Sequence, residues 1–178
     1  MIWGNLPFTS EFRVVQEATV SKKQSTQLWL SGYLKSPVLL IGERVSKRDG
    51  IFAIRGYRVQ LAHKFYLGKN ATSPEGFYMG PQVSYTNIKV SLKQWLKRDV
   101  YVQGSQINLV CLVGYQAIGK RAVVDIFCGL GYKKNDFFWH YSPKKIVPIP
   151  FSDSPGLYSI LKSPVKFTFG MNFGFAYD

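Results

Sequence analysis

The sequence predicts an all-β fold, an eight-stranded antiparallel up-and-down transmembrane β-barrel with two long extracellular loops. The first observation behind this prediction is the strict alternation of apolar and polar residues along several segments, which is the period of a strand. The second is composition, because aromatic residues make up 16% of the chain and charged residues only 19%. Aromatic residues favour strands, and their abundance also excludes intrinsic disorder.

The chain has 178 residues, which is enough for one ordinary domain and too little for two. We therefore treat residues 1–178 as a single barrel domain. The expected strands cover roughly residues 12–20, 27–34, 38–46, 52–67, 76–90, 106–117, 122–132 and 165–177.

The first three expected strands alternate less regularly than the others. They are separated by the polar segment 21–25 and by the dipeptide Ser36-Pro37. The fourth alternates clearly, with one apolar face and one polar or small face. Its apolar face consists of Tyr57, Val59, Leu61, Phe65 and Leu67, opposite Arg58, Gln60, Ala62, Lys64 and Tyr66.

The segment 76–90 and the C-terminal segment 165–177 show the clearest alternation in the chain. In the C-terminal segment nearly every apolar position holds a large side chain. We expect these residues to form a wall that faces lipid or a partner: Phe167, Phe169, Met171, Phe173 and Phe175. The intervening positions are small or polar, as in Gly170 and Asn172.

Segments 106–117 and 122–132 are expected to form a hairpin around the dipeptide Gly119-Lys120. If these are the two central turn residues, Cys111 lies directly opposite Cys128, and both face outward. Their Cβ atoms would then be about 4.5 to 5.5 Å apart. The pair forms either a cross-strand disulfide or, as we favour, two small apolar neighbours in lipid.

The polar faces distinguish a membrane barrel from a soluble one. A soluble barrel carries charged residues on its exterior, whereas here the polar positions are largely Gly, Ser, Thr, Asn and Gln. Small polar residues suit the narrow, filled interior of a membrane barrel. Basic residues gather between the strands instead, at Lys93, Lys97, Arg98, Lys133, Lys134, Lys144 and Lys145.

Connection lengths favour the same reading, because transmembrane barrels have short turns at one end and long loops at the other. With the N-terminus in the periplasm, the expected inner turns are 35–37, 68–75 and 119–121. The expected outer loops are 21–25, 47–50, 91–105 and 133–164, so the two long ones share a side.

Several segments resemble the small outer-membrane β-barrels of Bacteroidota, a family of unknown function that is distantly similar to the OmpA-type barrel. The resemblance covers residues from about Pro37 to the end and is carried by GERV at 42–45, GYRVQLAHKFYL at 56–67, GFYMGP at 76–81, VGYQ at 113–116, DIFCGLGY at 125–132 and the terminal residues 170–177. The family pattern has Tyr-Glu-Arg at 42–44 and Glu-Tyr-Arg at 62–64, so this chain lacks one acidic residue of that pattern. The resemblance implies a fold and a location and no activity.

A set of charged residues falls on the face expected to point into the lumen. It consists of Arg13, Glu17, Glu43, Arg58, Lys64, Asp125 and Lys166. These groups form either an ion path or, as we favour, a set of hydrogen-bonded pairs that fills a barrel too narrow for water flow. The C-terminal residues Phe173, Phe175 and Tyr177 resemble the aromatic insertion signal of bacterial barrels, apart from the final Asp178.

We expect no catalytic residue, no cofactor and no metal site. The two cysteines form no CxxC motif, and histidine occurs only at His63 and His140. His63 falls on the outward face near the expected periplasmic end, which is the wrong end for hydrolysis of outer-leaflet lipid A. His140 lies in an aromatic segment expected to be a folded loop.

The function expected from these observations is a non-enzymatic outer-membrane barrel, a structural or accessory subunit of a larger complex for secretion, nutrient uptake or barrel assembly. Its expected partners are outer-membrane lipid, lipopolysaccharide and that complex, and not nucleic acid. The expected location is the outer membrane of a Gram-negative bacterium, with any signal peptide removed or absent. The net charge of +13 keeps a soluble, nucleic-acid-binding β-barrel as the alternative. A lipid-A-modifying enzyme ranks third.

Overall fold

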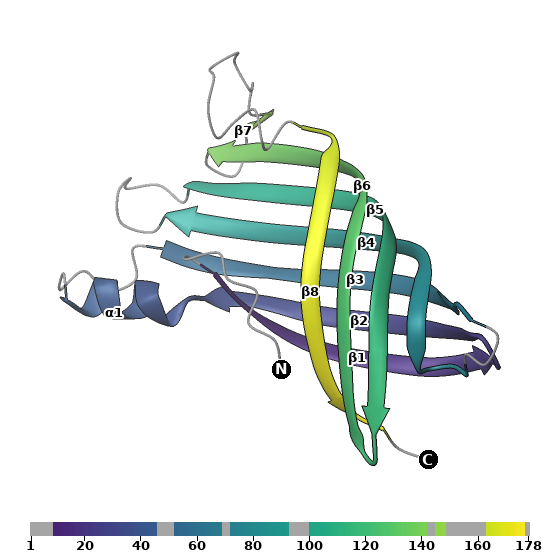
Figure 1. Ribbon diagram of the computed structural model, residues 1–178. Helices are drawn as coiled ribbons and strands as arrows, with labels where there is room; N and C mark the ends of the chain where they lie inside the picture. Colours follow the sequence, from purple (N-terminus) through teal and green to yellow (C-terminus); the bar gives the residue numbers. More distant parts are fainter. Residues whose placement is uncertain are drawn as a thin grey trace.

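The computed structural model describes residues 9–45, 52–68, 72–92, 100–141, 145–148 and 163–176. These residues form one antiparallel sheet of seven long strands and one short strand, together with one helix (Figure 1). The long strands are β1 (Thr9–Ser21), β2 (Gln24–Lys35), β3 (Phe52–Tyr66), β4 (Gly76–Leu92), β5 (Val100–Gly119), β6 (Ala122–Tyr141) and β8 (Val165–Phe175). The short strand is β7 (Lys145–Pro148), and the helix is α1 (Pro37–Val45).

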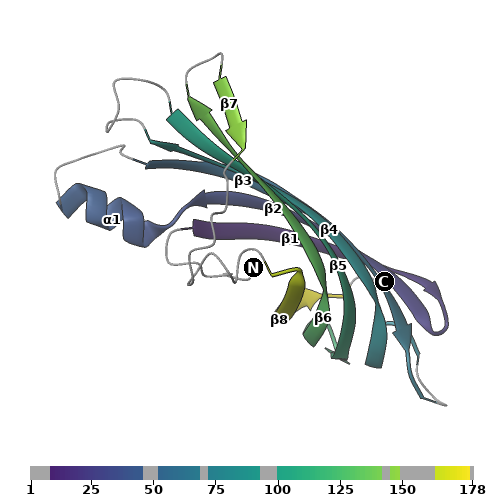
Figure 2. The same cartoon turned by 90° about the horizontal axis from the view of Figure 1, so that it is seen from above.

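The sheet follows a simple up-and-down order. Each strand from β1 to β6 pairs antiparallel with the next, and β7 and β8 both pair with β6. The all-β, antiparallel, up-and-down prediction is therefore confirmed. The sheet curls strongly, so that β8 passes in front of β1 and β2 in Figure 1, and Figure 2 shows the same curvature from above. This curl gives the sheet a concave and a convex face.

The third expected strand, residues 38–46, is wrong, because this segment forms helix α1. Pro37 is the first residue of the helix, where its missing N–H costs nothing, and Leu40 N donates to Ser36 O at 3.1 Å. A Ser-Pro pair followed by an apolar run is therefore a helix start and not a break between strands. Glu43, expected in the lumen, lies on this helix and on no strand.

The hairpin of β5 and β6 is longer than predicted. Residues 100–105 and 133–141, expected as loops, continue the two strands, and β7 adds residues 145–148. The adjacent residues Lys133 and Lys134 hide the alternation in the sequence. In the structure the strands stay in register there, and Gln106 Nε2 donates to Asn135 Oδ1 at 2.6 Å.

The connections separate into two ends of the sheet. The end that carries the β1–β2, β3–β4 and β5–β6 connections is called the turn end, and Lys23 Nζ there donates to Gly68 O at 2.9 Å. The opposite end carries α1 and the connections β4–β5 and β6–β7, and is called the helix end. The segment 21–25, expected beside the long loops, instead lies at the turn end. Because 38–46 is not a strand, the first two connections exchange ends.

The β5–β6 turn is centred one residue later than predicted. Gly119 pairs with Ala122, so Lys120 and Arg121 are the central residues, and Lys120 takes a left-handed backbone with φ of 34°. A left-handed first residue is typical of two-residue hairpin turns. Every pairing in this hairpin consequently shifts by two positions, which leaves each side chain on its predicted face.

The concave face is lined by the buried side chains. Its apolar cluster contains Trp29, Ala62, Tyr66, Tyr78, Val110, Leu112 and Phe127. Glycines opposite the large rings make room for them. A Cβ on Gly114 would approach Tyr78 Cζ to 2.5 Å, and one on Gly170 would approach Phe127 Cζ to 2.5 Å. The small residues of the polar pattern therefore allow the sheet to close tightly on its own aromatic side chains.

Candidate functional site

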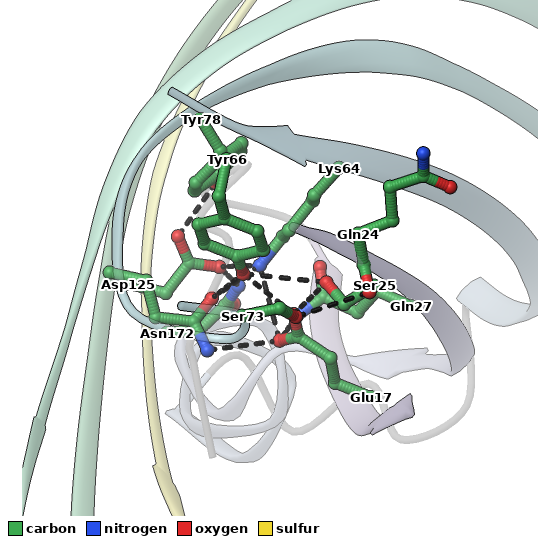
Figure 3. A network of polar contacts seen from close by, with 11 residues as sticks. Glu17, Gln24, Ser25, Gln27, Lys64, Tyr66, Ser73, Tyr78, Asp125 and Asn172 are labelled. Carbon is green, nitrogen blue, oxygen red and sulfur yellow. Dashed lines mark hydrogen bonds and ion pairs between the residues drawn. The ribbon is translucent and has the colours of Figure 1, made fainter. Parts of the chain in front are cut away.

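A network of polar side chains fills the concave face near the turn end (Figure 3). Each of the seven long strands contributes to it. The contributing residues, in strand order from β1 to β6 and then β8, are Glu17, Ser25, Lys64, Tyr78, Gln116, Asp125 and Asn172. Contacts between strands far apart in the sheet order fix its curl.

Lys64 is the centre of this network and is only 1% exposed. Its Nζ donates to Gln116 Oε1 at 2.6 Å, to Asp125 Oδ2 at 3.0 Å and to Glu17 Oε2 at 3.2 Å. The same nitrogen lies 4.5 Å from the centre of the Tyr78 ring. All three N–H donors of the ammonium are thus used, which is the condition under which a buried charge is tolerated.

The two acidic partners of Lys64 have further donors of their own. Glu17 Oε1 accepts from the hydroxyls of Tyr66, at 2.9 Å, and of Ser25, while its Oε2 accepts from Gln116 Nε2 at 3.1 Å. Asp125 Oδ1 accepts from the Tyr78 hydroxyl at 2.7 Å. Two carboxylates and one ammonium give this part of the network a formal charge of −1.

A second charged cluster lies toward the helix end of the concave face. Glu11 Oε1 accepts from Arg13 Nη2 at 3.0 Å and from Arg58 Nη1 at 3.5 Å. Lys166 is close enough to interact electrostatically with Arg58 and Glu11. This cluster therefore places three cations around the one carboxylate of Glu11.

Apolar rings separate the two clusters. Arg13 Cζ lies 4.7 Å from the centre of the Trp29 ring, and Trp29 packs edge-on against Phe127 with ring centres 5.3 Å apart. Tyr78, on which Lys64 rests, belongs to the same apolar cluster. This layering places packed rings between the two charged clusters, and it favours structural ion pairs over the ion path that the charged residues alone left open.

Six of the seven residues expected in the lumen lie on the concave face, namely Arg13, Glu17, Arg58, Lys64, Asp125 and Lys166, whereas Glu43 lies on α1. Sequence reasoning did not single out Glu11, Gln116, Tyr66, Tyr78 or Asn172. Glu11 precedes the expected start of its strand. The others follow the same alternation as Lys64 and Asp125, which was the available signal.

The convex face carries the large apolar side chains. The five residues of the predicted wall are all exposed, from 39% for Met171 to 74% for Phe175. Phe173 and Phe175 of the predicted insertion signal belong to this wall, and Tyr177 lies outside the described residues. On β4 the aromatic residues Phe77 and Tyr85 flank the aliphatic residues Met79 and Val83, all exposed.

The predicted pairing of Cys111 with Cys128 is wrong. Cys111 lies opposite Leu130, and Cys128 lies opposite Val113, because the turn is centred on Lys120 and Arg121. The two cysteines are diagonal neighbours with Cβ atoms roughly 7 to 8 Å apart, beyond disulfide range. Both are free thiols on the convex face.

These two thiols provide a test of what surrounds the convex face. If it contacts lipid, a membrane-permeant maleimide should label Cys111 and Cys128 in vesicles, whereas a charged thiosulfonate should label them at least about tenfold more slowly. Labelling is read by intact mass. A cysteine placed at Lys120, in the exposed turn, is the control that reacts with both reagents. Equal labelling of Cys111 by both reagents would contradict a lipid-facing position.

The structure places the two histidines on different strands. His63 Nδ1 lies 2.9 Å from Thr26 Oγ1, and its ring packs against Phe65 with centres 4.7 Å apart. It is thus an interstrand hydrogen-bonding partner on the convex side, near the turn end. His140 belongs to the end of β6 and is paired with Tyr101, so its segment is a strand and not the predicted folded loop.

Within the described ranges, no group of three or more His, Cys, Asp or Glu side chains is placed to bind a metal ion. Nor does any helix within those ranges combine the length and apolar character of a membrane span. No family model, no curated protein and no solved structure matches the chain.

Proposed function

We propose that this protein is a non-enzymatic outer-membrane β-barrel that serves as a structural or accessory subunit of a larger membrane complex. The observation that carries the proposal is the inverted distribution of polarity. Charged and amide side chains such as Lys64, Gln116 and Asp125 are buried on the concave face, while Phe and Leu side chains cover the convex one. A water-soluble sheet buries its apolar face instead.

The size of the apolar surface supports a lipid environment. Exposed apolar patches on soluble monomers rarely exceed a few hundred Å², whereas here the apolar side chains cover all seven long strands. The exposed large residues at the centre of this surface are Leu28, Leu30, Val59, Leu61, Val83, Leu109, Val113 and Leu130. Such a surface in water would drive aggregation.

The spacing of the aromatic residues fits a bilayer. On β3 the exposed aromatics Tyr57 and Phe65 bracket Val59 and Leu61. At ~3.3 Å per residue they are about 26 Å apart along the strand, or roughly 20 Å along the normal of a strand tilted by about 40°. Outer-membrane barrels carry an apolar band of about 25 Å between aromatic girdles, which is a similar height.

The arrangement of the connections supports the same proposal. The two tight turns, at 22–23 and 120–121, lie at the same end of the sheet, and α1 lies at the opposite end. Tight turns gathered at one end are typical of bacterial outer-membrane barrels, in which the short turns face the periplasm.

The side chains on the concave face support the role of a subunit over that of a channel or an enzyme. The Lys64 network and the packed rings of Trp29 and Phe127 lie on the concave side, where a channel would need open space. His63 is hydrogen-bonded to Thr26 Oγ1 on the convex side near the turn end, away from the end where a hydrolase of outer-leaflet lipid A would need its base. The nucleic-acid alternative is weakened because Arg13, Arg58 and Lys166 lie on the concave side, apart from the exposed aromatics.

The direct test is fractionation of cells that express the protein. We expect it in the outer-membrane fraction, resistant to extraction with carbonate and released by detergent. The folded protein should migrate differently before and after boiling, as stable barrels do. Recovery in the soluble fraction without detergent would overturn the membrane proposal, and binding of single-stranded oligonucleotides by that soluble form would support the alternative.

Removal of residues 170–178 should abolish membrane assembly. The deletion removes Phe173 and Phe175, exposes much of the β6 edge to lipid and breaks the bond from Asn172 Nδ2 to Asp125 Oδ2. A chain that lacks only Asp178 is the control and should assemble normally. Assembly is measured as protease resistance in outer-membrane vesicles, and normal assembly of the longer deletion would contradict the prediction.

A further inference from the structure

The seven long strands leave the sheet with an unusual pair of edges. Since each consecutive pairing is antiparallel, β1, β3, β5 and β8 run in one direction, and β2, β4 and β6 in the other. Within the described residues β1 pairs only with β2, and β8 pairs only with β6. The two unpaired edges therefore run parallel to each other, and an antiparallel closure between them is impossible.

A groove separates these two edges near the turn end. It encloses about 1070 Å³ and is lined by residues 12–17 of β1 and 172–175 of β8, together with Gln116 and Asp125. The side chains at its outer rim are apolar, as in Val14 and Phe173, and those at its floor are polar. A strand of a membrane barrel has apolar side chains outward and polar side chains inward, so a strand placed between β1 and β8 would match this rim and floor.

Two buried amides at the floor of this groove have oxygen atoms without a partner. Gln27 is 3% exposed and Asn172 is 7% exposed, and both line the groove. Gln27 Oε1 and Asn172 Oδ1 accept no hydrogen bond from the described residues. A buried acceptor without a donor costs about 1–3 kcal/mol. Both oxygens are covered, so an occupant with N–H or O–H groups on its inward side would supply the missing donors once the two amide side chains rotate toward the groove.

The charge of the groove defines the occupant further. Arg13 lines it and shares the single carboxylate of Glu11 with Arg58, and Lys166 lies close to the same pair. The acids on the other side, Glu17 and Asp125, are already bonded to Lys64. Of this cluster only Arg13 lines the groove, and Arg13 is the group that an acidic side chain of an occupant would complement.

We infer that the groove between β1 and β8, called the seam, binds one extended strand from a partner polypeptide. This strand would run antiparallel to both β1 and β8, with apolar residues outward, polar residues inward and an acidic residue facing Arg13. The inference rests on the proposed membrane location. Such a strand would complete an even, fully antiparallel barrel, in which no edge is left in lipid. It would also use the donors and acceptors of both unpaired edges at once.

Other occupants of the seam fit less well. A second copy inserted in the same orientation also offers the edges of β1 and β8. These run in the same direction as the edges of β1 and β8 in the first copy, so two copies could form only parallel pairs. A direct parallel pairing of β1 with β8 is the remaining alternative, and it is the outcome that the first experiment distinguishes.

The first experiment is a disulfide scan in phosphatidylcholine vesicles, in a background with Cys111→Ala and Cys128→Ala. Val14→Cys is combined in turn with a cysteine at each outward position of β8, namely Phe167, Phe169, Met171, Phe173 and Phe175. With room for a strand between them the two edges are about 9.5 Å apart, beyond the ~7 Å limit for a disulfide. We expect no intramolecular cross-link in any of the five variants.

The matched control is Val14→Cys with Leu30→Cys, which are register partners on β1 and β2 and should cross-link. A cross-link to β8 as efficient as this control would show that the sheet closes on itself and would overturn the inference. Failure of the control, or failure of the protein to enter vesicles, would instead count against the proposed membrane fold.

The second experiment measures binding of a probe strand in dodecylphosphocholine micelles. The probe is a fluorescent ten-residue peptide with alternating Val and Thr and with one inward Asp. We expect its anisotropy to report binding at least about tenfold tighter than that of peptides with Lys in place of Asp, or with alternate amides N-methylated, because like charges and lost edge bonds both oppose docking. Arg13→Gln should remove the preference for Asp over Lys. Equal binding of the N-methylated peptide, or no binding of the probe, would overturn the inference.

Discussion

Replacement of Lys64 by Met should destabilise the fold by about 3–5 kcal/mol, the usual cost of removing one partner from a buried ion pair. The substitution nearly preserves the side-chain volume, so the loss arises from charge. Glu17 and Asp125 would remain buried with no cation between them, although each would keep its hydroxyl donor, Tyr66 or Tyr78. Urea unfolding in phospholipid vesicles, followed by tryptophan fluorescence, measures the change.

Two further variants make the result specific to the network. Lys134→Met removes a lysine from the exposed side of β6 and should change the free energy of unfolding by no more than about 0.5 kcal/mol. Adding Glu17→Gln and Asp125→Asn to Lys64→Met should recover part of the loss, because the uncompensated charges are then absent. If Lys64→Met behaves like Lys134→Met, the network does not hold the curl of the sheet.

The consequences of this network extend to the fold as a whole. Glu17 on β1 contacts Gln116 on β5, although β2, β3 and β4 lie between them in the sheet order. A flat sheet would hold these two side chains far apart. The buried polar contacts therefore form only when the sheet is curled, and this distinguishes them from isolated ion pairs on a surface.

The alternation of residues was sufficient to predict most of this arrangement. Strands 52–67, 76–90 and 122–132, and the faces of Lys64 and Asp125, follow from a period of two, because one face of each strand is buried. Which partners Lys64 contacts could not follow from the sequence. Those contacts depend on the curl, which brings together strands that do not pair.

The two main errors in the predicted fold, at residues 38–46 and at the β5–β6 turn, both arise where one or two residues determine the backbone conformation. At Ser36-Pro37 the cap and the preset backbone angle of proline start a helix, and this outweighs the apolar run that was read as a strand. At the β5–β6 turn, glycine was taken as a central residue, whereas Lys120 adopts the left-handed conformation instead. Because residues 37–45 form a helix and not a strand, the sheet has seven long strands, and its edge strands β1 and β8 run parallel.

A charge placed at the middle of the convex face should have an effect that depends on depth in the membrane. Leu61 lies midway between Tyr57 and Phe65 on β3 and is 47% exposed. In a bilayer Leu61→Arg should cost about 2–4 kcal/mol of folding free energy, whereas Tyr57→Arg, at the edge of the apolar band, should cost about 0–1 kcal/mol. Reversible urea unfolding in phosphatidylcholine vesicles compares the two variants.

The same pair of variants separates the membrane proposal from its soluble rival. In water an exposed Leu61→Arg would change stability by about 0.5 kcal/mol or less and would improve solubility, since it breaks up an apolar patch. The effect of Leu61→Arg on the protein, and the difference between Leu61→Arg and Tyr57→Arg, are therefore not the same in water as in a bilayer. If Leu61→Arg and Tyr57→Arg lower the folding free energy equally, or if neither lowers it, the convex face does not contact lipid. In vesicles that contain only this protein and lipid, a large cost confined to Leu61→Arg would indicate hydrocarbon at that depth, because an arginine exposed to water carries no such cost.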